Sequence, residues 1–258
     1  MRTTVIFNVK GGVGKTVTTI NMAAELAARG NRVLCIDADP QCNLTEFFGL
    51  NEDGATLFDI LERGAEQYLP GLVQVTSIRN VDLVAGSMNL FLSDIRALRE
   101  KNRIGAIRDM IELLSEGDGY DYFLIDTPPS FSAATCAALA AADDVVIPIR
   151  LDAFSLAGVR RLLLQLQGMR EINPAIRVSG VLITQYDGTI VAKETADALR
   201  ESAVPVFGTL VRRTTAVDRS TFDRKPLREE PGTYARRCAE EYADMVREYL
   251  EGGARHGF

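Results

Sequence analysis

The sequence predicts an α/β fold in which a mostly parallel, twisted sheet carries helices on both faces. Short, nearly continuous apolar runs alternate with longer amphipathic stretches, a pattern typical of parallel strands that are buried on both faces. A glycine-rich loop joins the first apolar run to the first helical stretch, and aspartates follow two of the later runs. No repeat, low-complexity segment or flexible linker divides the chain, so residues 1–258 are expected to form a single domain.

The individual elements follow from these patterns in chain order. The expected strands are short apolar runs bounded by polar or turn-forming residues, namely Thr4–Phe7, Arg32–Ile36, Val81–Ala85, Tyr122–Ile125, Val145–Ile149, Val178–Ile183 and Val206–Val211. The expected helices have apolar residues at helical spacing, namely Thr18–Arg29, Leu90–Leu114, Leu156–Glu171, Val191–Ser202 and Tyr234–Leu250. The least regular part, Asn51–Thr76, is expected to form short helices over one edge of the sheet.

Composition limits the classes of protein to which the chain can belong. Apolar residues make up 47% and charged residues 25% of the sequence, as in ordinary globular proteins. No run approaches the roughly 20 apolar residues of a membrane-spanning helix, and the chain opens directly on a strand, so we expect a cytoplasmic protein with no signal peptide and no membrane partner. The four cysteines are scattered without a C-x-x-C pair, which argues against disulfides and zinc.

The most informative stretch is the glycine-rich loop Lys-Gly-Gly-Val-Gly-Lys-Thr at residues 10–16. Its glycines let successive backbone N–H groups point at an anion, and the helix N-terminus behind them adds a partial positive charge. Lys15 can reach the β- and γ-phosphates of a nucleotide, and the Thr16 hydroxyl can coordinate Mg²⁺. The loop therefore predicts the fold of the P-loop NTPases. The expected nucleotide contacts are Lys10, Gly11, Gly12, Val13, Gly14, Lys15, Thr16 and Val17.

Acidic residues follow two other predicted strands. Asp37 and Asp39 come just after Arg32–Ile36, and Asp126 closes Tyr122–Ile125 in the manner of a Walker B element. Because ligands of open parallel sheets lie at the carboxyl ends of the strands, these acids are expected on the same rim as the loop. One of the first two acids would support Mg²⁺ through a water while the other orients the attacking water, and Asp126 would hold a water of the Mg²⁺ shell. The competing interpretation is a plain Asp-Pro turn and an ordinary strand-end aspartate.

The two lysines of the loop are expected to act on different nucleotides. Phosphoryl transfer depends on positioning and charge neutralisation, which Lys15 supplies to the nucleotide of its own chain. The loop backbone already encloses those phosphates on its own side. Lys10, on the outer lip of the loop, could instead reach across to the nucleotide of a second protomer.

These motifs resemble the ParA/MinD group of P-loop ATPases, which carry a deviant Walker A box. The matching stretches are Phe7–Thr16, Asn21–Ala23, Val33–Thr45 and Ile125–Pro129, with a further similarity at Val204–Thr209. The sequence Asp-Pro-Gln at residues 39–41, followed by Asn43, is more similar to ParA than to MinD. The chain departs from the plain P-loop pattern at Val9, where the first glycine would fall, and from the family pattern at Val17, Cys42 and Val211.

The resemblance implies an ATPase that uses ATP and Mg²⁺ and forms an ATP-bound sandwich homodimer. In such a dimer Lys10 would contact the partner's nucleotide, and Lys10, Lys15 and Asp39 would serve hydrolysis to ADP and phosphate, with Asp39 as the catalytic acid. The residues implied to support the metal are Thr16, Asp37 and Asp126, with Asp37 also close to the phosphates and Arg212 at the adenine loop. ParA-type ATPases bind DNA without sequence preference. With a ParB-like or other stimulating adaptor they position a plasmid, a chromosome origin or a protein assembly on the nucleoid.

A basic segment is the candidate DNA-binding surface. The chain carries a net charge of −6, yet residues 200–237 contain eight arginines and one lysine against five acids, a local balance of +4. Cations that neutralise several phosphates are the basis of nonspecific DNA binding. The preferred contacts are Arg212, Arg213, Arg219, Arg224 and Lys225, with Arg236 and Arg237 as additions on the last helix.

The alternative function in the same group is that of a MinD-like, membrane-associated ATPase that regulates cell division or the placement of an assembly. It requires a C-terminal amphipathic helix with a basic face. Residues 240–251 contain five acids and one arginine, which anionic lipid would repel. The sequence therefore favours the DNA-bound alternative.

Overall fold

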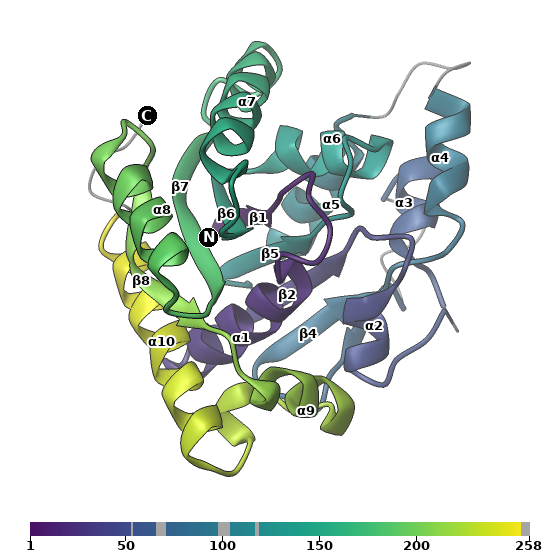
Figure 1. The fold of residues 1–258 in the computed structure, drawn as a ribbon. Coiled ribbons are helices and arrows are strands. Elements are labelled where there is room, and N and C mark those ends of the chain that lie inside the picture. The colour runs from purple at the N-terminus through teal and green to yellow at the C-terminus, as the bar shows by residue number, and fades with distance from the viewer. Residues whose placement is uncertain (53, 66–70, 98–103, 117–118, 254–258) are drawn as a thin grey trace.

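The computed structural model describes residues 1–52, 54–65, 71–97, 104–116 and 119–253, and the structural statements below concern these residues. Their strands form one eight-stranded sheet in the order β3-β4-β2-β5-β1-β6-β7-β8 (Figure 1). All neighbouring strands are parallel except β3 and β4. The strands are β1 (Arg2–Ile6), β2 (Val33–Asp37), β3 (Val73–Val75), β4 (Val81–Val84), β5 (Tyr122–Asp126), β6 (Asp144–Arg150), β7 (Arg177–Tyr186) and β8 (Val206–Arg212).

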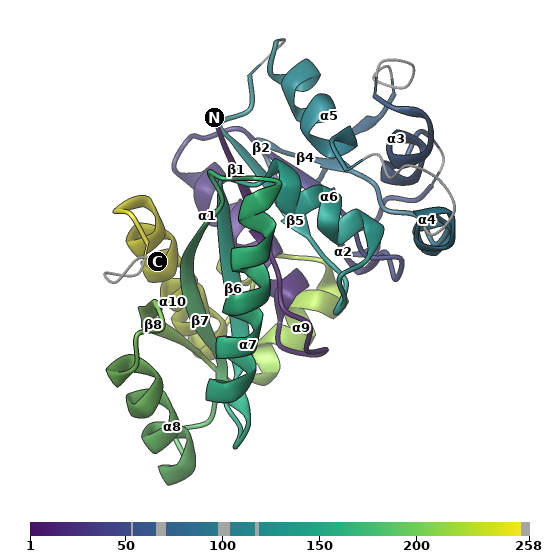
Figure 2. The same cartoon turned by 90° about the horizontal axis from the view of Figure 1, so that it is seen from above.

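Helices cover both faces of this sheet, as the view from above shows (Figure 2). One face packs against α3 (Leu57–Arg63), α4 (Leu90–Ala97), α5 (Ala106–Ser115), α6 (Ala133–Ala141), α7 (Ser155–Gly168) and α8 (Ile190–Glu201). The other face packs against α1 (Lys15–Ala28), α2 (Asn43–Phe47), α9 (Thr215–Asp223) and α10 (Thr233–Leu250). Short 3-10 turns, η1 (Met169–Glu171) and η2 (Leu227–Glu229), follow α7 and α9. The predicted α/β fold is confirmed.

Alternation along the strands explains the two apolar cores. In β1, Val5 faces the core under α3 to α8, whereas the next residue, Ile6, faces the core under α1 and α10. Successive side chains of a strand point to opposite faces, so a central parallel strand needs apolar residues at nearly every position. The C-terminal helix completes the second core with Tyr242 and Tyr249, both buried.

Several predicted elements differ from the observed ones. The single helix expected at Leu90–Leu114 is wrong, since α4 ends at Ala97 and α5 begins after Gly105, with residues 98–103 outside the described part. The expectation of short helices over one edge at Asn51–Thr76 is confirmed only in part: among the described residues of this stretch α3 is the one helix, and residues 73–75 instead form the antiparallel edge strand β3. Helices α2 and α9 were not predicted. Both are short, and α9 buries only Ser220 fully.

Strand register brings the expected site residues to one rim of the sheet. Ile6 at the end of β1 pairs with Asp126 at the end of β5, and Asp126 pairs in turn with Asp37 at the end of β2. The glycine-rich loop leaves from the same level, directly after β1. Within the described residues, no helix combines the length and the apolar character needed to cross a bilayer.

Candidate nucleotide-binding site

The glycine-rich loop curls between β1 and α1 through two left-handed residues. Gly12 has φ 70° and Gly14 has φ 82°, a conformation that glycine adopts without the steric cost of a side chain. Gly14 is the residue that precedes the first turn of α1, and Val13 between the two glycines is buried. The curl thus places the N-terminus of α1 behind the loop, the arrangement that suits phosphate groups.

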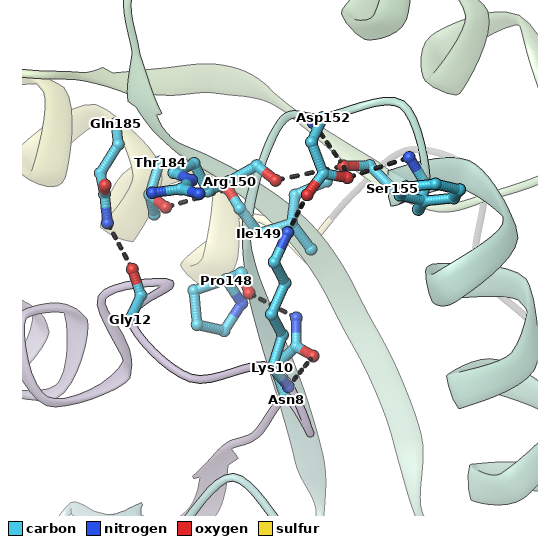
Figure 3. Close-up of polar contacts among 11 residues, drawn as sticks. Asn8, Lys10, Gly12, Pro148, Ile149, Arg150, Asp152, Ser155, Thr184 and Gln185 are labelled. Carbon is cyan, nitrogen blue, oxygen red and sulfur yellow. Dashed lines mark hydrogen bonds and ion pairs between the residues drawn. The ribbon is translucent and has the colours of Figure 1, made fainter.

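Side chains from the neighbouring strands hold the outside of this loop (Figure 3). The Thr184 hydroxyl lies 2.9 Å from the Val13 carbonyl oxygen, and the Gln185 amide donates to the Gly12 carbonyl oxygen at 2.6 Å. On the other side of the curl, the Asn8 side chain donates to Pro148 O at 2.8 Å and accepts from the Lys10 backbone N–H at 3.0 Å. With the Gly12 and Val13 carbonyl groups bound outward, the loop N–H groups that follow Lys10 can face a ligand.

Lys15 lies folded beneath the loop. Its ammonium group donates to the carbonyl oxygens of Asn8 at 3.1 Å and Lys10 at 3.3 Å, and the residue is buried. Burial lowers the pKa of Lys15 from its ordinary value, while the negative charges of Asp126 and Asp39 act in the opposite direction. Among the described residues this buried cation is hydrogen-bonded only to neutral carbonyl oxygens, so it is well placed to gain from an arriving phosphate.

Thr16 and Asp126 form the second part of the site. The Thr16 hydroxyl donates to Asp126 Oδ2 at 2.6 Å, and the Thr19 hydroxyl lies 3.4 Å from Asp126 Oδ1. Asp126 is fully buried, and this burial, with the negative charge of Asp37 nearby, raises its pKa to about 8. A neutral or weakly ionised carboxyl group at this point would become a stable carboxylate once a divalent cation neutralised it.

Asp37 and Asp39 have different surroundings. Both oxygens of Asp37 are bound, Oδ2 by the backbone N–H and hydroxyl of Thr45 at 2.9 and 2.7 Å and Oδ1 by the backbone N–H of Asp39 at 3.2 Å. Burial raises the pKa of Asp37 to about 6, although these hydrogen bonds oppose the change. The Asp39 carboxylate accepts through Oδ1 from the Gln41 backbone N–H at 2.9 Å. Asp37 therefore fixes the backbone of residues 37–45, whereas Asp39 keeps its second oxygen free of hydrogen bonds within the described chain.

The oxygen atoms at this rim fit a magnesium ion that is shared with a nucleotide. The described residues contain no cluster of three or more His, Cys, Asp or Glu side chains that could hold a metal ion by itself. Mg²⁺ prefers oxygen ligands, keeps several waters, and is usually held by one or two protein groups together with phosphate oxygens. The adjacent Thr16 hydroxyl and Asp126 carboxylate provide that limited set of oxygen donors.

A pocket of about 850 Å³ opens beside the first turn of α1. The residues that line it belong to α1, α2, α9 and the residue that follows α9, namely Thr16, Val17, Ile20, Asn43, Glu46, Phe47, Asp218, Thr221, Phe222 and Arg224. Val17, one of the expected nucleotide contacts, thus faces open space next to the loop. Arg212, expected near the adenine, is instead engaged with α10, where its backbone N–H donates to Glu241 at 2.8 Å and its guanidinium pairs with the same carboxylate.

Lys10 points away from Lys15. Its ammonium group forms an ion pair with Asp152, which lies between β6 and α7 of the same chain (Figure 3). Hydrogen bonding from Lys10 lowers the pKa of Asp152 from its ordinary value. The structure therefore brings Lys15, Thr16, Asp37, Asp39 and Asp126 to one site, while it directs Lys10 to a neighbouring loop.

The expected DNA contacts divide into two groups. Arg219 pairs with Asp223 at 3.2 Å, Arg224 lies 3.9 Å from Glu46, and Arg212 is bound to Glu241. In contrast, Arg213 and Lys225 are exposed and have no ion pair with a described residue. The members of the second group can meet phosphates without first breaking an ion pair to a described residue, although the charge of Arg213 also acts on Asp187.

Thr184, Gln185 and Asp152 were not singled out from the sequence. Each follows or closes the carboxyl end of a strand, β7 for the first two and β6 for the third. The criterion that identified Asp37 and Asp126, a polar residue at the end of an apolar run, applies to them as well. No pattern in the sequence, however, shows that the side chains of these three residues turn toward the glycine-rich loop.

Comparisons with known proteins agree with this geometry. A family model described as an AAA domain matches residues 1–178. The chain is 37% identical over 261 residues to the chromosome-partitioning ATPase Soj of Thermus thermophilus, covering 96% of this chain and 98% of that one. It is 32% identical over 257 residues to the chromosome partitioning protein ParA of Caulobacter vibrioides, covering 97% and 94% of the two chains.

Solved structures share the fold along the whole chain. The structure is similar to cobyrinic acid a,c-diamide synthase from Mycobacterium smegmatis with bound ADP and magnesium, with a TM-score of 0.80, 25% identity and coverage of 100% of this chain and 99% of that one. It also resembles the ATP complex of Cyanothece McdA(D38A), with a TM-score of 0.82, 23% identity and coverage of 97% and 96%. At that identity the second likeness concerns the fold alone.

Proposed function

This chain belongs to the Soj/ParA family of ATPases, and we propose that it is a single-domain ParA-type ATPase that pairs on binding ATP and positions cargo on DNA. The observation that carries the proposal is the arrangement of Lys15 beneath the curled loop beside the Thr16–Asp126 pair. A nucleoside triphosphate with Mg²⁺ requires such groups to bind its phosphates and its metal ion. Relatives that span nearly the whole chain are chromosome-partitioning proteins.

Each residue of the site has a distinct task in the proposed reaction. The loop N–H groups and Lys15 bind the phosphates and neutralise charge that develops during transfer. Thr16 and Asp126 would hold Mg²⁺, which when bound would neutralise negative charge on the phosphates. Asp39 orients the attacking water through its free carboxylate oxygen, while Asp37 holds the loop that carries Asp39 through the contacts with Thr45.

Dimerisation and turnover can be tested with one substitution. Asp39→Ala removes the group that orients water but leaves the phosphate-binding groups intact, so ATP with Mg²⁺ should trap the variant as a dimer. Light scattering measures the dimer and phosphate release measures hydrolysis. Lys15→Ala is the control, because it should bind no nucleotide and remain monomeric. An Asp39→Ala variant that stays monomeric with ATP, or that hydrolyses ATP at the wild-type rate, would contradict the assignment.

DNA binding is the part of the proposal that separates this function from its alternative. A MinD-like protein would use an exposed amphipathic C-terminal helix to bind lipid. In this chain α10 places Tyr242, Met245 and Tyr249 in the core of the sheet, so its apolar face is already buried. We expect the ATP-bound protein to shift nonspecific duplex DNA at low salt and not to sediment with anionic liposomes. The opposite pair of results would favour the MinD-like function.

The cargo and the adaptor belong to the same proposal. Relatives named for chromosome partitioning favour a chromosome origin, and a plasmid or a protein assembly would use the same cycle. A separately encoded ParB-like adaptor is expected to stimulate hydrolysis. Stimulation of phosphate release by the product of a neighbouring gene, lost in Lys15→Ala, is the corresponding test.

A further inference from the structure

The loop that follows β4 is bonded to the segment that carries Asp39. The backbone N–H of Gly86, the second residue after β4, donates to the Thr45 hydroxyl oxygen at 2.9 Å, and that hydroxyl donates to Asp37 Oδ2 at 2.7 Å. We propose that this loop positions Asp39 for ATP hydrolysis, with Thr45 and Gly86 as its positioning residues. The inference rests on the proposed role of Asp39, the orientation of the attacking water.

The Thr45 hydroxyl links two segments that are 41 residues apart in the sequence. It donates its only proton to Asp37 and accepts from Gly86, while the Thr45 backbone N–H donates to the same Asp37 oxygen at 2.9 Å. Thr45 is 2% exposed and Asp37 is fully buried. A buried polar group that loses its partner has no water to replace it, so these contacts should persist while the chain is folded.

Asp37 passes the position of Thr45 on to Asp39. The second oxygen of the Asp37 carboxylate, Oδ1, accepts from the Asp39 backbone N–H at 3.2 Å. A shift of this carboxylate would therefore change the direction in which Asp39 points. The phosphate-binding groups Lys15 and Thr16 lie on a different element, α1, so such a shift should affect hydrolysis more than nucleotide binding.

Gly86 is required by a close approach of two backbones. It does not have a positive φ, so its backbone conformation does not by itself demand glycine. A Cβ atom at this position would lie 3.0 Å from both the Cγ atom and the backbone oxygen of Asp37. Because carbon atoms pack without strain at about 3.5–4.0 Å, a side chain at residue 86 would push the Asp37 carboxylate out of place. The loop thus limits the position of Asp37 on one side.

A second contact holds this loop in place. The Ser87 hydroxyl donates to Glu52 Oε2 at 2.7 Å, and the Met88 backbone N–H donates to Glu52 Oε1 at 3.2 Å. Three successive residues of the loop are therefore bound, the first to Thr45 and the next two to Glu52. A loop held at three points can keep Asp37 in one position before the substrate arrives, as the precise orientation of a catalytic group requires.

Steady-state ATP hydrolysis tests the positioning role. Thr45→Val keeps the shape of the side chain but removes the hydroxyl, and Gly86→Ala places a methyl group against Asp37. Both variants should lower kcat by roughly 10- to 100-fold, up to the loss that a misplacement of about 1 Å can cause. KM and the affinity for a fluorescent ATP analogue should stay close to the wild-type values, because α1 and the glycine-rich loop are unchanged.

Two further variants separate this role from a general effect of substitution. Thr45→Ser keeps the hydroxyl and should restore most of the kcat that Thr45→Val loses. Thr195→Val is the matched control, because it removes a hydroxyl that donates at 2.7 Å to the Val191 carbonyl oxygen within α8. This control should hydrolyse ATP at the wild-type rate.

The lifetime of the ATP-bound dimer gives a second measurement. If Thr45→Val slows hydrolysis alone, light scattering after ATP addition should show a dimer that persists longer than that of wild type, as expected for Asp39→Ala. A substitution that merely loosened the fold would instead reduce the amount of dimer. A shorter-lived or weaker dimer in Thr45→Val would therefore overturn the proposal.

The hydrolysis rates give the remaining decisive outcomes. Wild-type kcat in Thr45→Val, or an equal fall of kcat in Thr45→Val and Thr45→Ser, would overturn the proposal. The two Thr45 variants decide the matter even if Gly86→Ala does not fold. An Asp39→Ala variant that hydrolyses ATP at the wild-type rate would instead contradict the proposed role of Asp39, so the two failures are measured separately.

Discussion

Gln185 adopts a backbone conformation that few residues other than glycine accept. Its φ is 51°, and from this position its side-chain amide reaches the Gly12 carbonyl oxygen at 2.6 Å. Left-handed backbone at a residue with a Cβ costs free energy, and such residues concentrate at functional sites. We interpret this conformation as the means by which β7 holds the phosphate loop in its binding shape.

The first prediction concerns this contact. Gln185→Ala should weaken nucleotide binding by roughly 2- to 12-fold, because one hydrogen bond contributes about 0.5–1.5 kcal/mol to the ordered loop. Titration with a fluorescent ATP analogue measures the effect. Gln185→Glu is the informative companion, since one carboxylate oxygen would face the Gly12 carbonyl oxygen and should weaken binding further. Wild-type affinity in both variants would show that the loop keeps its shape without β7.

Substitutions of the two lysines of the loop should impair different steps of the ATPase cycle. Lys15→Ala removes the buried cation beneath the loop and should abolish nucleotide binding. Lys10→Ala leaves that cation in place, so it should bind nucleotide almost normally but lose pairing and turnover. The same titration, followed by light scattering with ATP, separates the two outcomes. Equal loss of nucleotide binding in both variants would refute a role for Lys10 on the partner's nucleotide.

Asp126 should make the stability of the nucleotide-free protein depend on pH. Burial raises the pKa of Asp126 to about 8, whereas an aspartate in an unfolded chain titrates near 4. Between these values the folded chain retains a proton that the unfolded chain has released, so the free energy of unfolding falls as the pH rises from about 4 to about 8. Asp37, whose pKa is raised to about 6, adds to the lower part of this range.

Urea unfolding in EDTA at about pH 5, 6.5 and 8 measures this decline. Asp126→Asn carries no titrating proton at this site and should flatten the decline, most clearly between about pH 6.5 and 8. The substitution should also remove the additional stabilisation that Mg²⁺ with ATP gives the wild-type protein. An unchanged slope in Asp126→Asn would show that other groups are responsible.

At the scale of elements, the sequence predicted correctly the strands and helices whose buried apolar side chains follow a regular pattern. The central strands are apolar at nearly every position, and α1 and α10 have clear buried faces. Strand β3 escaped prediction because it has only three residues and Val75 is 80% exposed, so it lacks the apolar run of a buried strand. The break between α4 and α5 was missed although Gly105 lies there, a residue that disfavours a helix interior.

The same limit applies to the candidate site. Motif spacing identified Lys15, Thr16 and Asp126 because one strand–loop–helix unit and one strand end fix their positions. The direction of Lys10 depends instead on Asp152, more than a hundred residues away in the sequence. Contacts of that kind follow from the order of the strands, which no local pattern contains.

Helix α9 provides a prediction at this scale. Glu230, between η2 and α10, has a side chain that is 1% exposed, and its Oε1 atom has no hydrogen-bond partner in the described chain. Arg219 of α9 lies 4.0 Å from its other oxygen. Arg219→Ala should therefore destabilise the fold by about 1 kcal/mol, a value kept small because Arg219 itself is exposed. Urea unfolding of Arg219→Ala, Glu230→Gln and the double variant tests this.

The double variant shows which contact of Arg219 causes the loss of stability in Arg219→Ala. If Arg219 acts by compensating the buried Glu230 carboxylate, Arg219→Ala should cost little in a protein that already carries Glu230→Gln. Equal costs in both backgrounds would mean that Arg219 stabilises α9 only through Asp223. Either way, Arg219 is a poor residue with which to test DNA binding, since its loss affects folding.

At the scale of the whole molecule, charge is separated rather than evenly spread. The net charge is −6, yet the segment from residue 200 to 237 is positive by four charges. Net negative charge keeps the single protein from adhering generally to nucleic acid, whereas a local basic surface can still neutralise phosphates. If two chains pair on binding ATP, as proposed, the number of such contacts doubles, and DNA binding should then respond to ATP.

The last prediction uses Arg213 and Lys225, two expected DNA contacts that form no ion pair with a described residue. Replacing Arg213 and Lys225 with alanine should weaken the binding of the ATP-bound dimer to all duplex sequences alike. Each phosphate contact contributes roughly 0.9 to the slope of log affinity against log salt, and the substitutions remove up to two contacts from each protomer. The salt dependence should therefore become flatter while ATP-driven dimerisation is unchanged.

The control is a pair of exposed arginines, Arg160 and Arg161, on α7, which lies at the opposite end of the molecule from α9 (Figure 1). Replacing both with alanine changes the net charge of each chain by the same amount as the test pair. Loss of affinity only in the Arg213 and Lys225 variant would locate the DNA surface beside α9, because a general electrostatic effect would weaken both variants equally. Equal weakening of DNA binding in both variants would mean that the affinity depends only on the total charge of the dimer. Loss confined to the α7 variant would place the surface on the opposite face of the sheet, beside α7.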